Sequence, residues 1–187
     1  MSNLDMNSAI DVFPTLLRKA GVPEKFQDLD KFPREYIRPN IVELCNNIQT
    51  FDGVVLLSGL KRGKTTNAAA ILLSYLDSRR YIVDTQDVGL YVSVNQLCYQ
   101  NRTQDRYARD NEVQAVVRKA AAARCLVLDG LFSYLTQIDD LMLQAIYDAR
   151  QNKSCITIVT TSMTDPLNCA GSIMYRIARD AKIKEVF

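Results

Sequence analysis

The chain has 187 residues, of which 48% are hydrophobic and 24% are charged, and its formal net charge is +2. This is the composition of an ordinary soluble globular protein, long enough to bury the core of one domain. The net charge is too small to indicate a nucleic-acid or membrane partner, so any basic surface must come from local clustering. Histidine is absent, which excludes Ser-His-Asp and Cys-His catalysis and every metal site that needs an imidazole ligand.

The cysteines and the apolar runs together predict a cytoplasmic protein. The cysteines are scattered and form no Cys-x-x-Cys pair: Cys45, Cys98, Cys125, Cys155 and Cys169. An odd number of isolated cysteines favours reduced thiols over a disulfide framework. No apolar run approaches the roughly 20 residues of a membrane helix, and the N-terminus lacks a signal-peptide pattern. We therefore expect a cytoplasmic location and no membrane partner.

Residues 1–39 are predicted to form an N-terminal helix and an irregular lead-in. The helix is expected over residues 8–20 and to be interrupted by Pro14. The lead-in contains further prolines and shows no hydrophobic periodicity. Asn40 is expected to cap the next helix, over residues 41–50, and the main domain is expected to begin there.

Strands alternate with helices along the rest of the chain. Buried strands are predicted at residues 54–57, 81–84, 125–129, 155–161 and 183–186. Helices are predicted to begin at residue 67 and to cover 86–99, 112–123, 138–151 and 172–179, with an arginine-rich break over 101–110. This alternation predicts an α/β fold with a central parallel sheet and helices on both faces.

The most informative motif is the stretch Ser58-Gly59-Leu60-Lys61-Arg62-Gly63-Lys64-Thr65-Thr66. It follows an apolar strand and opens a helix, which is the layout of a phosphate-binding P-loop. Lys64 is expected to lie along the outer phosphates of ATP, and the Thr65 hydroxyl to ligate Mg²⁺. Ser58 replaces the usual first glycine, so we expect it to sit in a tight turn that glycine normally fills. The alternative is a Gly-Lys-Thr that merely begins a helix.

Asp129 ends a run of four apolar residues, where a P-loop enzyme needs a carboxylate beside the magnesium ion. The alternative is an ordinary buried strand that ends in aspartate. Many ATPases carry a glutamate at the next position, but here that residue is Gly130. We therefore expect slow hydrolysis, and we expect Gly130→Glu to raise the rate unless the backbone there has a positive φ.

Two further candidates for the site come from the last part of the chain. Thr160, Thr161 and Ser162 end a strand, where a hydroxyl could contact the γ-phosphate; the alternative is that threonine simply suits a strand. Arg176 has apolar neighbours and no carboxylate within the four residues before it. It is interpreted either as a finger that reaches the nucleotide of a neighbouring subunit or as a surface arginine.

The segment that begins at residue 99 mixes arginines with tyrosines. The residues predicted to contact single-stranded DNA are Tyr99, Arg102, Arg106, Tyr107 and Arg109. Arginines neutralise phosphates and tyrosines stack on bases, which is how single strands are bound. The alternatives are a solvated face and the arginine-rich lid of a small-molecule kinase.

From about Leu17 onward the sequence resembles the AAA+ helicase loaders of the DnaC/DnaI type and the related IstB transposition ATPases. The resemblance rests on residues 17–28, which precede the core, on 125–129, similar to the Walker B strand, and on 145–162, similar to a helix and the sensor-1 strand. Thr161 stands where the family has an asparagine, and Arg176 matches the arginine of its finger segment.

The resemblance implies a P-loop, AAA+-like ATPase domain over residues 40–187, without a full lid subdomain. It implies a DNA replication factor that binds ATP and Mg²⁺, self-associates into an ATP-dependent oligomer, grips single-stranded DNA and engages a replicative helicase. Lys64, Asp129, Thr161 and Arg176 would then carry a slow ATP hydrolysis. The alternatives are a small-molecule or nucleotide kinase and a nucleotide-binding interaction protein that does not hydrolyse.

Overall fold

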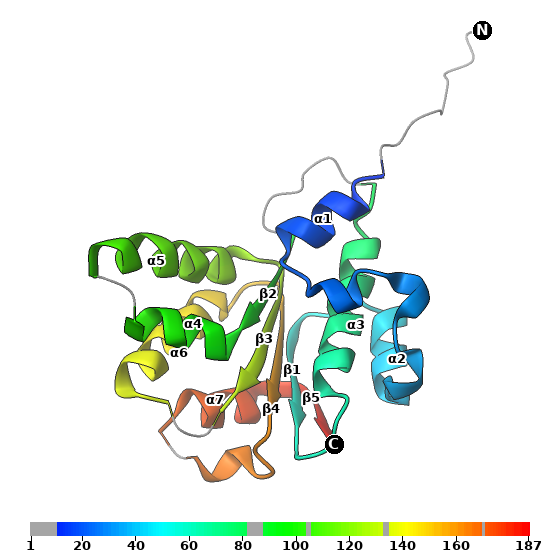
Figure 1. Ribbon diagram of the computed structural model, residues 1–187. Coiled ribbons are helices and arrows are strands. Elements are labelled where there is room, and N and C mark those ends of the chain that lie inside the picture. The colour runs from blue at the N-terminus through cyan, green and yellow to red at the C-terminus, as the bar shows by residue number, and fades with distance from the viewer. Residues whose placement is uncertain (1–10, 82–87, 104–105, 133–134, 170) are drawn as a thin grey trace, which may run out of the picture.

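The computed structural model describes residues 11–81, 88–103, 106–132, 135–169 and 171–187. In this part of the chain five parallel strands form one sheet in the order β2-β3-β4-β1-β5. The strands are β1 (Gly53–Ser58), β2 (Gly89–Ser93), β3 (Cys125–Leu131), β4 (Ile156–Thr161) and β5 (Ala181–Val186). The sheet is seen nearly edge-on in the middle of Figure 1.

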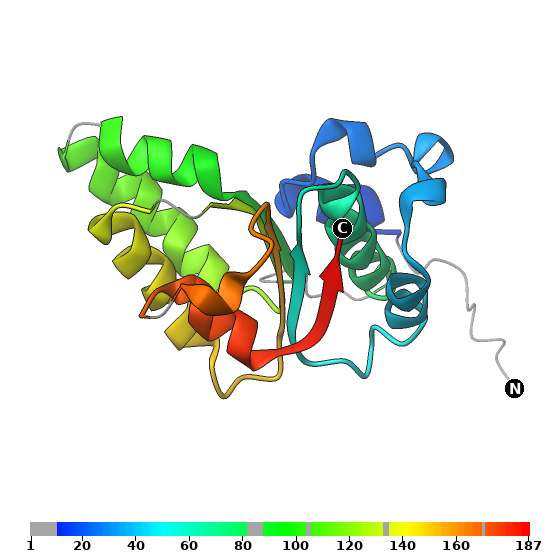
Figure 2. The ribbon, with the colours of Figure 1, turned by 90° about the horizontal axis from the view of Figure 1, so that it is seen from below.

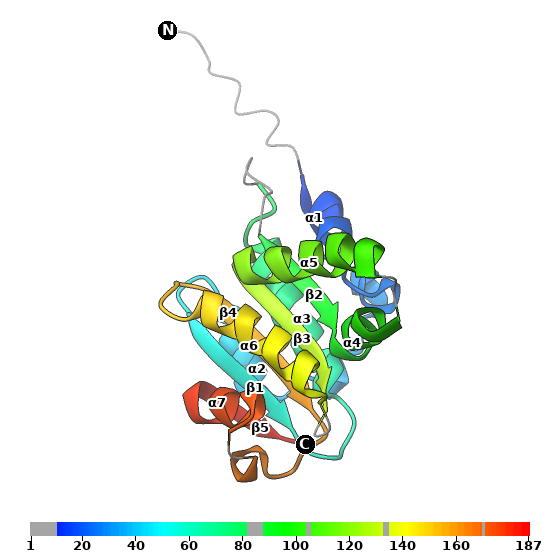
Figure 3. The same cartoon turned by 90° about the vertical axis from the view of Figure 1, so that its left-hand side faces the viewer.

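Helices cover both faces of the sheet. One face carries α1 (Phe13–Lys19), α2 (Pro39–Asn46) and α3 (Lys64–Asp77), on the right of Figure 1. The other face, turned toward the viewer in Figure 3, carries α4 (Val94–Thr103), α5 (Arg106–Ala122), α6 (Gln137–Arg150) and α7 (Ile173–Asp180). The predicted α/β architecture is therefore confirmed. No helix in the described residues is long and apolar enough to cross a membrane.

The strands divide the hydrophobic core into two layers. On β1, Val55 and Leu57 belong to the layer under α3, whereas Val54 and Leu56 belong to the layer under α6 and α7. Successive side chains of a strand point to opposite faces, so both sets are buried only when both faces are covered. This is why β1, β3 and β4 read as continuous apolar runs and were predictable from the sequence.

The N-terminal segment differs in detail from its prediction. Pro14 does not interrupt the first helix, because it lies in the first turn of α1, where no backbone N–H is needed; residues 8–10 lie outside the described part. The cap of α2 is Arg38 rather than Asn40, and α2 ends at Asn46 rather than at residue 50. The Asn40 side chain donates instead to Glu185 Oε1, at 2.5 Å.

The lead-in is less irregular than predicted and packs onto the sheet. It forms three short 3₁₀ turns: η1 (Glu24–Phe26), η2 (Leu29–Lys31) and η3 (Arg34–Tyr36). Phe13, Leu16 and Phe26 lie in the same core layer as the inner face of α3. The lead-in therefore helps to cover the face of the sheet that bears α3.

The second strand of the chain was predicted at the wrong place. Tyr81 lies in a turn with 61% of its surface exposed, and residues 82–84 lie outside the described part. The strand is β2, within the segment predicted as a helix from residue 86. Pairing with β3 overrides the local preference there. A Cβ on Gly89 would lie 2.9 Å from Leu72 Cδ1, so this glycine allows β2 to approach α3 closely.

The arginine-rich break over residues 101–110 is also corrected. Helix α4 runs to Thr103 and α5 begins at Arg106, so most of this segment is helical. Arginine, glutamine and alanine are good helix formers, so a polar composition here is as compatible with a helix surface as with a loop.

Candidate nucleotide-binding site

The candidate site lies at the carboxyl edge of the sheet. Because β4 lies between β1 and β3 in the sheet, the ends of β1, β4 and β3 follow one another along this edge, at the bottom of Figure 1. Ligands of open α/β sheets bind outside the carboxyl ends of the strands. Thr65 of the P-loop and Asp129 are 64 residues apart in the sequence, but both lie at this edge and are in contact.

The P-loop connects β1 to α3 and turns at its two glycines. Gly59 and Gly63 have φ values of +99° and +111°, and Gly63 is the N-cap of α3. Lys64 and Thr65 are the first residues of the helix, so the loop delivers the chain to a helix N-terminus with unpaired amides and a positive dipole end. This is the backbone arrangement that binds phosphate.

The prediction that Ser58 occupies a tight turn is wrong. Ser58 is the last residue of β1 and is buried, and the turn falls on Gly59. A Cβ on Gly59 would lie 2.2 Å from the carbonyl oxygen of Phe187. The Phe187 amide in turn donates to the Ser58 carbonyl, at 2.8 Å, and Figure 2 shows this end of the chain beside the loop. The position that requires glycine is therefore residue 59 rather than residue 58.

Lys64 lies across the loop. Its ammonium donates to the carbonyl oxygens of Gly59, at 2.6 Å, and Lys61, at 2.7 Å. Burial lowers the pKa of Lys64, while the charge of Asp129 opposes that shift. The other predicted loop residues Leu60, Lys61 and Arg62 are exposed, and Thr66 is half-buried in the first turn of α3.

Asn67 joins the P-loop helix to the lead-in and was not predicted. Its buried amide accepts from the Arg38 backbone N–H, at 2.9 Å, and donates to the carbonyls of Tyr36 and Gly63, at 2.8 and 2.7 Å. A cavity of about 360 Å³ lies beside this junction, lined by Glu35, Tyr36, Ile37, Arg38, Pro39, Arg62 and Phe187. The P-loop thus has a hollow next to it that the lead-in helps to form.

Asp129 is surrounded by hydroxyl groups. The hydroxyls of Thr65 and Thr160 contact its Oδ1 at 3.0 and 2.6 Å, and the Tyr91 hydroxyl donates to its Oδ2 at 2.6 Å. Burial, together with the adjacent carboxylate, raises the pKa of Tyr91 far above its ordinary value, so the phenol keeps its proton. The sequence identified Asp129 and Thr65, but neither Tyr91 nor the contact with Thr160 was predicted.

Of the two candidate threonines Thr160 and Thr161, Thr160 lies beside Asp129. Neighbouring residues of a strand point to opposite faces, so only one of the two hydroxyls can meet the carboxylate. The Thr160 hydroxyl also accepts from the Gly130 amide at 2.8 Å, whereas that of Thr161 is buried and accepts from the Met163 amide at 3.2 Å. The irregular pairing between Leu128 and Leu131 sets this register, and the sequence does not reveal it.

Gly130 has a φ of +81°, and a Cβ there would lie 3.4 Å from Asn95 Nδ2. A glutamate would therefore be strained at this position, and the expectation that Gly130→Glu restores a working base fails its stated condition. The next carboxylates along the chain are already engaged. Asp139 binds Arg102 and Thr136, and Asp140 accepts from the Ile173 amide at 3.1 Å.

The oxygen atoms of Thr65 and Asp129 fit a magnesium ion. Mg²⁺ prefers hard oxygen ligands and usually takes one or two from the protein, the rest coming from water and phosphate. The donors around Asp129 are uncharged hydroxyls, so its charge is not neutralised by an ion pair with any described side chain. Clusters of three or more acidic, cysteine or histidine ligands are absent from the described residues.

Arg176 lies on α7 and forms an ion pair with Asp148 of α6. Its guanidinium carbon also lies 5.5 Å from the centre of the Tyr147 ring. The sequence suggested that Arg176 lacks a nearby carboxylate, but the partner comes from another helix. A finger role toward a neighbouring subunit would require this pair to open.

The residues predicted to bind DNA fall on two helices. Tyr99 lies on α4 with 67% of its surface exposed. Arg102 is turned toward α6, where it pairs with the buried Asp139. Arg106, Tyr107 and Arg109 fall within α5, but their side chains lie outside the described part. The kinase alternative needs an arginine-rich lid. The arginines proposed for this lid, 102, 106 and 109, lie within helices α4 and α5.

Known structures share this fold. The chain matches a crystal structure of DnaI with a TM-score of 0.62 and 18% identity, over 82% of this chain and 93% of that one. A crystal structure of the DnaC helicase loader matches with a TM-score of 0.55 and 16% identity, over 79% and 86% of the two chains. No protein-family model matches the sequence, and none of the curated proteins matches it significantly.

A structure of DnaA gives a third comparison. AMPPCP-bound DnaA from Aquifex aeolicus matches with a TM-score of 0.57 and 13% identity over 79% of this chain. The match covers 44% of that DnaA chain, so this chain spans less than half of its length. At these identities the comparisons show the fold. The chain has the fold of DnaI and of the DnaC helicase loader.

Proposed function

We propose that this chain is an ATP-binding DNA replication factor of the helicase-loader type. In this proposal it binds ATP with Mg²⁺, assembles with further copies on single-stranded DNA and engages a replicative hexameric helicase. The observation that carries the proposal is the contact between Thr65 and Asp129, because it joins the P-loop helix to the carboxylate that a P-loop ATPase needs. The shared fold with DnaI and the DnaC helicase loader supports the choice of replication over other P-loop functions.

The roles of the site residues follow from their positions. The amides of the loop and of the first turn of α3 bind the phosphates, and the Lys64 ammonium balances their charge. Thr65 and Asp129 hold Mg²⁺, which supplies charge stabilisation at the phosphates when it is bound. The cavity of about 360 Å³ between the lead-in and Arg62 is adjacent to the loop, and we assign it to the adenine ring of ATP.

Hydrolysis is proposed to be slow. Gly130 has no side chain to orient water, and both Asp139 and Asp140 are held by other groups. A general base or a water-positioning group contributes about 10²–10⁴-fold to such a reaction. The ATP-bound form is therefore long-lived, which suits a factor that uses ATP to hold an assembly together.

In this proposal, assembly and DNA binding use the face of the sheet that carries α4, α5, α6 and α7. Tyr99 and the arginines at the start of α5 contact the single strand, and Arg176 releases Asp148 to reach a neighbouring nucleotide. The proposed domain comprises residues 40–187, with residues 1–39 as the lead-in.

The first test is Lys64→Ala. Loss of the ammonium removes the cation that balances the outer phosphates, so ATP affinity should fall at least about tenfold. Affinity is measured by titration with a fluorescent ATP analogue, and Lys184→Ala, an exposed lysine on β5, is the matched control. Light scattering with ATP and a single-stranded oligonucleotide should show larger assemblies of the wild type and of Lys184→Ala, but not of Lys64→Ala.

Two results would contradict the proposal. Unchanged ATP affinity in folded Lys64→Ala would refute the P-loop assignment. A wild-type chain that binds ATP but stays monomeric with both ligands would refute the loader function and favour a nucleotide-binding interaction protein.

A further inference from the structure

No sequence motif predicts Tyr91 as a site residue, although its hydroxyl contacts Asp129. Tyr91 lies on β2 opposite Val127 of β3. Residues 127 and 129 of a strand lie on the same face, and a long side chain reaches a diagonal neighbour on the adjacent strand. This register explains how the Tyr91 phenol meets Asp129 at 2.6 Å from a strand that carries no part of the P-loop.

We propose that Tyr91 is a positioning residue that fixes the Asp129 carboxylate for Mg²⁺; this rests on the proposed nucleotide function. The two carboxylate oxygens have different partners. Thr65 and Thr160 both contact Oδ1, whereas Tyr91 is the hydrogen-bond donor to Oδ2 among the described residues. Tyr91 therefore determines the rotation of the carboxylate.

That rotation matters because of Thr65. For the Thr65 hydroxyl to offer a lone pair to a cation, its proton must point elsewhere, and Oδ1 of Asp129 is the acceptor at 3.0 Å. If the carboxylate turns, Thr65 loses this acceptor. A partner that orients a ligand in this way typically contributes 10–100-fold to metal affinity.

The phenol is well placed to do this because the backbone of Tyr91 is held from two sides. One side is the ladder with β3. On the other side the Tyr91 amide donates to the carbonyl of Ala20 in the lead-in, at 2.7 Å. The ring also packs against the core layer under α3. The hydroxyl therefore has little freedom to follow a moving carboxylate.

The test is Tyr91→Phe, which keeps the ring and removes the hydroxyl. ADP and ATP affinities are measured by titration in Mg²⁺ and again in EDTA. The gain in affinity that Mg²⁺ provides should fall about tenfold, while the affinity in EDTA stays unchanged. Tyr147→Phe is the matched control, because the buried Tyr147 hydroxyl also donates to a carboxylate, Asp180 at 3.0 Å, outside the site.

A merely structural role would give a different result. Equal loss of affinity in Mg²⁺ and in EDTA, or an unchanged gain from Mg²⁺, would overturn the proposal. Adding Tyr91→Phe to Asp129→Asn should cost nothing further in Mg²⁺-dependent affinity, and additive losses would also overturn it. Failure of the proposed function would appear already in the wild type, as no nucleotide affinity in either buffer.

Discussion

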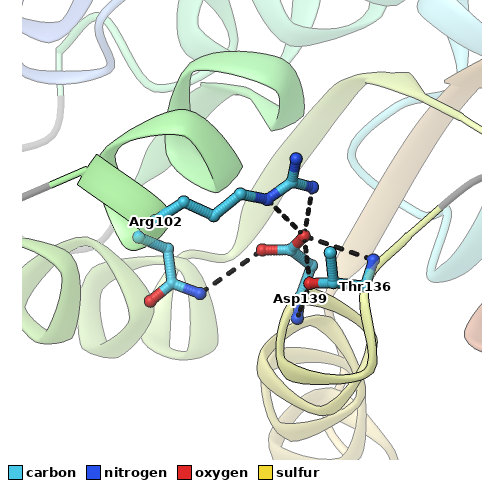
Figure 4. Close-up of polar contacts among 4 residues, drawn as sticks. Arg102, Thr136 and Asp139 are labelled. Carbon is cyan, nitrogen blue, oxygen red and sulfur yellow. Dashed lines mark hydrogen bonds and ion pairs between the residues drawn. The ribbon is translucent and has the colours of Figure 1, made fainter.

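Two aspartates bracket the loop between β3 and α6, and their surroundings differ. Asp129 receives contacts from the hydroxyls of Thr65, Thr160 and Tyr91. Asp139 is fully buried and binds the Arg102 guanidinium from α4, with Thr136 and Asn101 as further donors, as Figure 4 shows for the labelled residues. One carboxylate is oriented by neutral groups, and the other is paired with a cation.

The difference distinguishes a candidate binding residue, Asp129, from a structural contact between two helices at Asp139. Hydroxyl donors hold a carboxylate in place without cancelling its charge, so Asp129 retains the charge that the proposed Mg²⁺ site requires. Burial alone would raise the pKa of Asp139, but the hydrogen bonds from Arg102, Thr136 and Asn101 outweigh it and hold that pKa below its ordinary value. Asp139 is therefore charged and neutralised within the fold, and it ties α4 to the first turn of α6.

The largest effect on function is expected from Asp129→Asn. The amide keeps the size of the side chain but removes the charge that attracts Mg²⁺. The gain in nucleotide affinity on adding Mg²⁺ should fall roughly 10–100-fold, while the melting temperature without nucleotide changes little. Titration in Mg²⁺ and in EDTA checks this, and a full Mg²⁺ response in the variant would show that Asp129 is not part of the magnesium site.

Asp139→Asn should give the opposite pattern. Asp139 is buried, whereas the Arg102 side chain is 45% exposed, so the variant mainly loses the charged acceptor for the hydrogen bonds from Arg102 and Thr136. The melting temperature should therefore fall by several degrees. Nucleotide affinity, with and without Mg²⁺, should stay as in the wild type. If the variant instead loses its Mg²⁺ response, the two aspartates are not separate in function.

The pH dependence sharpens this prediction. Because the folded-state pKa of Asp139 is depressed, the stability it contributes is fully present well above the ordinary value of about 3.9. It is lost as the pH falls from that value toward the lower folded-state pKa. The difference in melting temperature between wild type and Asp139→Asn should therefore be constant near neutral pH and shrink below about pH 4.

The same comparison shows what the sequence could and could not predict. Asp129 was predictable because it ends an apolar run in a chain that also has a P-loop, and both signals are local. Tyr91, the contact of Thr160 with Asp129 and the partner of Asp139 were not, because they depend on strand register and on which helices pack together. Arg102 is an example: its sequence context indicated DNA binding, whereas in the fold its side chain pairs with Asp139 of α6.

Backbone conformation was the other quantity that residue types did not determine. The pattern indicated that Ser58 filled a glycine turn, but the turn is at Gly59, where Phe187 approaches the loop. Likewise Gly130 looked like a missing glutamate, but its φ of +81° makes glycine the residue that this irregular part of β3 requires. In both places a contact distant in sequence, or a local φ value, decided the outcome.

The smallest effect is expected from Thr136→Ala, which tests whether the contact between α4 and α6 at Asp139 depends on the helix cap. Thr136 is the N-cap of α6 and forms a capping box with Asp139. Loss of such a cap costs about 1 kcal/mol, or roughly 2–4 °C in a chain of this size. Thr136→Ser keeps the hydroxyl and should melt close to the wild type. Because Thr136 also donates to Asp139 Oδ2 at 2.6 Å, the losses from Thr136→Ala and Asp139→Asn should not add. Full additivity in thermal melts would show that the cap and the ion pair stabilise α6 independently, and Asp139 would then join α4 to α6 through Arg102 alone.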